Sequence, residues 1–181
     1  MRRALIFAIP FLILLAVNAN AQWGKPAAPA IAEADGYANI PNAAVQPDKK
    51  RVYKAVFDAT RAATDPAKLL PALNMAGSEL NAFAVEHVPP SNVKFVVVFH
   101  GPAVDGILNE AAYKAKFGIA NPNLKVLSEM KKAGVAIYVC GQHLIAENID
   151  PATLSRDVTV ASDALIVLMS YENDGYALLS F

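Results

Sequence analysis

The chain has 181 residues, of which 55% are hydrophobic and 18% are charged, with 16 basic and 16 acidic side chains. This is enough apolar chain for one domain with a buried core, which excludes an intrinsically disordered protein. The zero formal charge leaves no basic excess for phosphates, so neither a nucleic acid nor an anionic membrane surface is an expected partner. A single cysteine, Cys140, excludes a disulfide within the chain.

The N-terminal segment has the features of a secretory signal peptide. A basic start, Met1-Arg2-Arg3, precedes an apolar run from Ala4 to Val17, and Ala19-Asn20-Ala21 provides a small-residue cleavage sequence. The run contains Pro10 and is shorter than the roughly 20 apolar residues that a membrane span needs. We therefore expect residues 1–21 to be removed after Ala21, leaving a periplasmic or secreted protein with no membrane attachment.

Residues 22–49 are expected to form an irregular arm rich in proline and alanine. Its prolines and glycines break any helical or strand periodicity. Two aromatic residues, Trp23 and Tyr37, are candidates to pack the arm on the domain or on a partner subunit, and an exposed linker is the alternative. The folded domain is then predicted to span residues 50–181.

The domain begins with a predicted strand over Val52 to Phe57. Asp65-Pro66, an N-cap residue followed by proline at the first helical position, predicts the start of a helix. Pro71 is expected to kink or restart this helix in its early turns. Helical spacing continues through five apolar positions, namely Leu73, Ala76, Leu80, Phe83 and Ala84.

The rest of the domain alternates strands with helices. Val93 to Phe99 is a nearly continuous apolar and β-branched run, typical of a strand buried on both faces of a parallel sheet. Further strands are predicted over 135–140, 158–160 and 176–180, and helices over 107–117, from Asn121-Pro122 to Gly134, over 142–148 and over 161–173. Five strands interleaved with helices predict a three-layer α/β/α sandwich around a mostly parallel five-stranded sheet.

Reactive side chains fall at two predicted strand ends, which is where open α/β sheets collect their ligands. His100 follows one buried strand and Cys140 ends the next. Gly101 and Gly141 would let the backbone approach a substrate, and a helix that starts near Gln142 would point amide N–H groups at the sulfur. Such a position favours the thiolate, so Cys140 is the candidate nucleophile.

Structural roles are the alternatives for the same residues. Cys140 is either reactive or a small buried residue, since free cysteine is among the most buried types. His143 is either a proton donor to the sulfur or a polar residue at a helix start, and His100 either contacts a ligand or shapes a turn. The carboxylates on predicted helices are expected on solvated faces; they are Glu110, Glu129, Asp163 and Glu172.

Four segments resemble the DsrE-like family, specifically its exported members. They are 96–103 (VVVFHGPA), 121–124 (NPNL), 134–142 (GVAIYVCGQ) and 174–178 (DGYAL). The resemblance implies a five-stranded α/β/α sandwich that assembles into trimers or hexamers. In the cytoplasmic sulfur-relay members a cysteine at this strand end carries a persulfide between partner proteins. Carried over, that role falls on Cys140, with sulfur donor and acceptor proteins as partners and no cofactor.

A metal site and a non-catalytic module are the alternatives to a sulfur carrier. Cys140 and His143, at C-x-x-H spacing, could join His100 to hold copper or zinc. A non-catalytic oligomeric or ligand-binding module with an incidental thiol is another alternative. A hydrolase built from Cys140, His100 and Asp105 lacks a nucleophile elbow, and the glycines form no nucleotide-binding loop.

Overall fold

The computed structural model describes residues 24–181, so the expected leader and Trp23 lie outside the described residues. The sheet has five strands in the order β4-β3-β2-β1-β5, and all neighbouring pairs are parallel. The strands are β1 (Tyr53–Ala59), β2 (Val93–Phe99), β3 (Ala136–Cys140), β4 (Thr159–Ala161) and β5 (Ala177–Ser180). None of the helices in this part of the chain combines the length and the apolar character of a membrane span.

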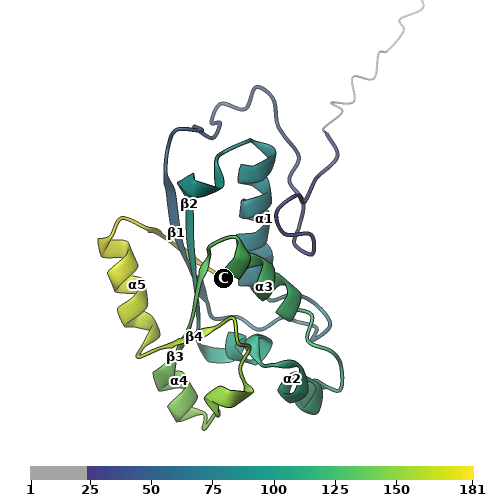
Figure 1. The fold of residues 1–181 in the computed structure, drawn as a ribbon, viewed down its shortest axis with the longest axis vertical. Helices are drawn as coiled ribbons and strands as arrows, with labels where there is room; N and C mark the ends of the chain where they lie inside the picture. Colours follow the sequence, from purple (N-terminus) through teal and green to yellow (C-terminus); the bar gives the residue numbers. More distant parts are fainter. Residues whose placement is uncertain (1–23) are drawn as a thin grey trace, which may run out of the picture.

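Helices cover both faces of the sheet, as Figure 1 shows. On one face lie α1 (Pro71–Val85) and α3 (Leu124–Lys132), and on the other lies α5 (Ala164–Asn173). Right-handed crossovers explain this division. From β1 to β4 the chain adds each strand on one side of the last, whereas β5 pairs on the opposite side of β1, so the connection that contains α5 crosses the other face of the sheet. The shorter helices are α2 (Glu110–Phe117) and α4 (Gly141–Ala146). The predicted α/β/α sandwich is confirmed.

The prediction that a helix begins at Asp65-Pro66 is wrong. The Asp65 carboxylate caps only a turn, accepting a hydrogen bond from the backbone N–H of Ala67 at 2.9 Å. Helix α1 begins instead at Pro71, where Leu70 has an extended ψ of 140°. The ring of a proline disfavours the helical conformation in the preceding residue, so Pro71 starts the helix rather than kinking it.

Helix α5 begins at Ala164 after its N-cap Asp163, three residues later than predicted, and Ala161 belongs to β4. Two more helices also begin later than predicted. Residues 101–107 form a 3₁₀ segment, and α2 starts after Asn109, whose side chain accepts a hydrogen bond from the Ala112 N–H. Helix α3 starts after Asn123, because the buried Asn121 side chain holds the preceding loop through carbonyls of Gly106 and Leu108. Side-chain amides therefore set both boundaries.

The arm is irregular apart from one isolated bridge, and it packs on α1. Asn81 of α1 is fully buried, and its amide exchanges hydrogen bonds of 2.8 and 2.9 Å with the N–H and carbonyl of Ile31. Ile31 is itself fully buried, and a Cβ at Gly77 would lie 2.5 Å from the Cβ of Ala34. The Asn81 amide and buried aliphatic side chains of the arm thus fix the arm to the domain.

Candidate functional site at the carboxyl ends of β2 and β3

Cys140 is the last residue of β3 and the N-cap of α4. Its side chain lies on the α5 face of the sheet, in an apolar cluster with Val98 and Leu168, and only 5% of the residue is exposed. The Sγ atom lies 3.8 Å from Oδ2 of Asp163, in hydrogen-bonding geometry. The single thiol is therefore buried at a strand end with one carboxylate against it.

Asp163 is held in place by the helix that it caps. Its Oδ1 accepts hydrogen bonds from the N–H groups of Leu165 at 2.8 Å and Ile166 at 3.2 Å. The other oxygen is left facing the sulfur of Cys140. The prediction that Asp163 lies on a solvated helix face is wrong in that respect. An N-cap signal was present in the sequence, because Asp163 directly precedes an apolar helical run.

His100 is oriented by a carboxylate of the neighbouring strand. Its Nε2 lies 2.7 Å from Oδ1 of Asp58, and the Ser180 hydroxyl donates to Oδ2 of the same carboxylate at 3.3 Å. Asp58 and Ser180 are register partners of β1 and β5. Neither residue was a candidate from the sequence. A carboxylate inside the apolar strand 53–59 was the available signal for Asp58.

His100 and Cys140 leave neighbouring strands on the same face. Phe99 pairs with Val139, so the next residues along each strand, His100 and Cys140, continue that register. The backbone of His100 is extended, and its N–H donates to the Ala59 carbonyl at 3.1 Å, which prolongs the ladder beyond β2. The sequence prediction that these two residues meet at one edge of the sheet is consistent with this geometry.

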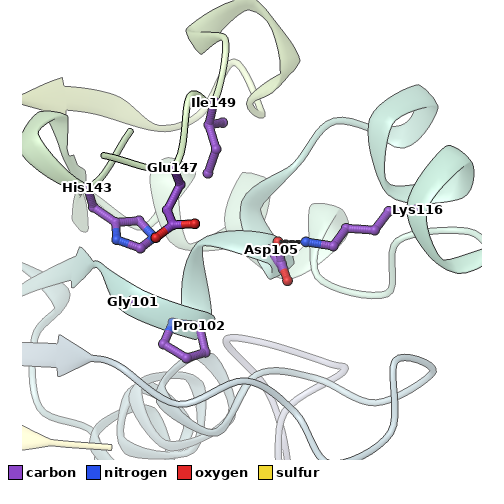
Figure 2. A pocket seen from close by; sticks show the side chains of 7 residues that line it. All are labelled: Gly101, Pro102, Asp105, Lys116, His143, Glu147 and Ile149. Carbon is purple, nitrogen blue, oxygen red and sulfur yellow. Dashed lines mark hydrogen bonds and ion pairs between the residues drawn. The ribbon is translucent and has the colours of Figure 1, made fainter. Parts of the chain in front are cut away.

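His143 lies elsewhere, in a cavity of about 390 Å³ beyond the strand ends. Figure 2 shows His143 of α4 and Glu147, the residue that follows this helix, projecting into the cavity, with the Asp105–Lys116 ion pair on its far side. Cys140 does not line this cavity, so the candidate residues are divided between two places. The lining residues are Gly101, Pro102, Asp105, Lys116, His143, Glu147 and Ile149.

The three candidate substrate-binding residues also have separate environments. Gly101 lines the cavity and has a φ of 57°, a left-handed conformation that favours glycine. Gly141 faces protein instead, because a Cβ there would lie 2.7 Å from the carbonyl oxygen of Ala161. Gln142 is exposed. Close backbone approach at Gly141 thus brings α4 against β4.

The domain that carries this geometry matches a known protein family. Residues 54–181 match the sequence profile of the DsrE/DsrF-like family. The chain belongs to the DsrE/DsrF-like family. A search of curated proteins finds no match.

Two solved structures share the fold of this DsrE/DsrF-like domain. One is MTH1491 from Methanobacterium thermoautotrophicum, a protein of unknown function, with 19% identity and a TM-score of 0.54 over 71% of this chain and 99% of that one. The other is the ychN protein from E. coli, with 16% identity and a TM-score of 0.50 over 72% of this chain and 100% of that one. At these identities the similarity establishes the fold.

The metal site and the hydrolase triad are not assembled in residues 24–181 of this DsrE/DsrF-like domain. Within residues 24–181, no three His, Cys, Asp or Glu side chains come together in a group that could hold a metal ion. His143 lies in the cavity, and His100 pairs with Asp58 rather than with the Asp105 that a hydrolase would use. What remains is a thiol beside a carboxylate, with a carboxylate-oriented imidazole on the adjacent strand.

Proposed function

We propose that this DsrE/DsrF-like protein is a sulfur carrier in which Cys140 bears a persulfide. The observation that carries the proposal is the 3.8 Å contact between the Cys140 sulfur and the Asp163 carboxylate at the end of β3. Family membership supports it, because the DsrE-like family is linked to sulfur relay. His100, which continues the adjacent strand in register with Cys140, is the candidate for proton transfer.

The transfer step is a thiol–disulfide type exchange. The Cys140 thiolate attacks the outer sulfur of a persulfide or polysulfide donor, R–S–SH, and a new S–S bond forms while the S–S bond of the donor breaks. The sulfane sulfur passes to Cys140, and the leaving thiolate R–S⁻ takes a proton. The proton of the Cys140 thiol goes to Asp163 or His100, so the step needs neither oxidant nor reductant.

Access to the sulfur requires a local movement. Because Cys140 is 5% exposed, a donor reaches the sulfur only when a neighbouring segment moves aside, and we propose that the segment before α5 does so. That segment is short, and Asp163 connects it to both the helix N-terminus and the thiol. We propose that release of the Asp163 cap opens the site.

A second candidate function rests on the same burial. Cys140 packs among Val56, Val98 and Leu168, as an inert apolar residue would. In that case the protein is a non-catalytic ligand-binding module, and the 390 Å³ cavity lined by His143 is its candidate binding place.

We further propose that the protein acts outside the cytoplasm as a homo-oligomer. Export is supported by the leader pattern of residues 1–21. Self-association is supported by an apolar surface on α5, where Leu165, Ile166 and Met169 are 60%, 52% and 55% exposed. Apolar side chains grouped in this way commonly mark a protein interface. Light scattering checks the assembly, and N-terminal mapping of the exported protein checks cleavage before Gln22.

Intact-mass analysis tests the carrier directly. The mature protein is incubated with inorganic polysulfide, and we expect a product heavier by one sulfur atom that reductant removes. Cys140→Ser should give no adduct, and Asp163→Asn, which retains the cap geometry, should form it at a changed rate. A wild-type thiol that stays unmodified in the native protein but reacts after unfolding contradicts the carrier and favours the second candidate.

A further inference from the structure

A second cavity lies on the face of the sheet opposite Cys140, between α1 and the edge strand β5. Its volume of about 350 Å³ is within the range of small-molecule sites. Helix α1 packs on β1 and β2, and α3 packs on β3, so the sheet beside β5 is left open on this face. The cavity is therefore a product of the sheet order, which places the returning strand beyond the reach of α1.

Aromatic rings form the walls of this cavity. The rings of Tyr53 and Phe83 have centroids 4.6 Å apart, and those of Phe57 and Phe95 are 5.1 Å apart. Phe181 stacks on Phe57 at 6.0 Å, which extends the same cluster towards β5. Ring faces carry negative charge density, so a group of rings around one space favours a cation there.

One acidic residue, Glu79, lines the aromatic cavity. Met75, Glu79 and Phe83 are spaced by four residues on α1 and line the cavity together. The Glu79 carboxylate makes no ion pair with any residue of 24–181, and burial raises its pKa above the ordinary value. A half-buried carboxylate without a counter-ion lowers the free energy of unfolding, and a bound cation would remove that cost.

No Lys or Arg side chain of residues 24–181 forms an ion pair with Glu79. Lys54 contributes to the wall, but its ammonium donates to the Asp174 carbonyl at 2.9 Å and lies over the Tyr176 ring at 5.4 Å. That ammonium therefore belongs to the opposite face of the sheet. Among the residues lining the cavity, Glu79 has the one acidic side chain.

We propose that this cavity binds an organic cation, an ammonium group carried on an apolar body. The ammonium pairs with Glu79 beside the rings of Tyr53 and Phe83, which contact each other, and the apolar part lies along the partly buried Leu179 and Phe181. This is a binding function separate from sulfur transfer, because the cavity and Cys140 lie on opposite faces of the sheet.

Titration with matched probes tests the site. Calorimetry or NMR shifts of the aromatic protons would follow 2-phenylethylammonium, the neutral isostere 2-phenylethanol and the anion 3-phenylpropionate. We expect the cation to bind about tenfold or more tightly than the alcohol, and the anion to bind weakest. Equal binding of cation and alcohol overturns the proposal, since the carboxylate would then have no role.

Variants separate this site from the surface and from Cys140. Glu79→Gln keeps the shape of the side chain and should abolish the preference for the cation, whereas the exposed Glu172→Gln control should keep it. Cys140→Ser should bind the cation like the wild type, whatever becomes of the sulfur carrier. Concentration-dependent association that closes the cavity, unaffected by Glu79→Gln, would show that a second copy occupies it and would overturn the proposal.

Discussion

The imidazole of His100 and the carboxylate of Asp58 form a pair across β1 and β2, with Nε2 2.7 Å from Oδ1. A carboxylate at one ring nitrogen fixes the ring orientation and leaves the other nitrogen for a different partner. Ser180 holds the second oxygen of the same carboxylate. The pair thus has the construction of an oriented acid–base group.

Asp58→Asn is expected to slow persulfide formation on Cys140 by about tenfold, and His100→Gln by about 100-fold, because proton transfer loses its oriented group. The rate of sulfur uptake from polysulfide, followed by mass spectrometry, measures both. Asp174→Asn, an exposed carboxylate at the end of α5, is the matched control and should be unchanged. Wild-type rates in both variants would remove His100 from the mechanism.

Gly141→Ala is expected to lower the free energy of unfolding by about 1–3 kcal/mol, because the new Cβ overlaps a backbone oxygen that cannot rotate away. That oxygen belongs to Ala161 and would lie 2.7 Å from the Cβ. Urea unfolding measures the change. Gly24→Ala, which meets nothing within 4 Å, is the control. An unchanged midpoint for Gly141→Ala would mean that α4 shifts freely against β4.

Asn81→Leu is expected to release the arm from α1. The amide makes contacts of 2.8 to 3.1 Å with backbone groups of Ala30, Ile31 and Asp35, and an apolar side chain leaves those groups unsatisfied. We expect the free energy of unfolding to fall by about 2–4 kcal/mol. We also expect new proteolytic cleavage within residues 24–50. Asn74→Leu removes an exposed pair with Asp35 and should have a smaller effect. Equal protease resistance of wild type and Asn81→Leu would contradict this role.

Glu79 predicts a dependence of stability on pH. Burial raises the pKa of its carboxyl above 4.5, so the folded state favours the protonated form, and stability is lost as the pH rises through the folded pKa. The neighbouring Tyr37 also has a raised pKa, mainly from burial, and stays neutral in this range. Glu79→Gln should therefore unfold at a higher temperature than the wild type near neutral pH. The difference should disappear below pH 4.5; a difference that does not vary with pH would point to altered packing instead.

Strand cores were predictable from the sequence, and the partners of the site residues were not. The run Val93–Phe99 is buried in any register, so its position followed from composition alone. The placement of Cys140 and His100 at strand ends followed from the same pattern. Asp58 and Asp163 could not be assigned to them, because those contacts depend on which strands pair and how α5 returns, at separations of 42 and 23 residues.

The pairing of β5 with β1 has a consequence for how the protein folds. Ser180 and Asp58 are 122 residues apart, so the contact that completes the His100 pair joins distant parts of the chain. Closing such a separation is slow, and the remaining strands can assemble before it occurs. An intermediate without β5 would therefore expose β1 as an edge strand. In that intermediate Ser180 could not hold the Asp58 carboxylate that orients the His100 imidazole. In the proposed exported protein, the His100–Asp58 pair would then be complete only after the last strand docks.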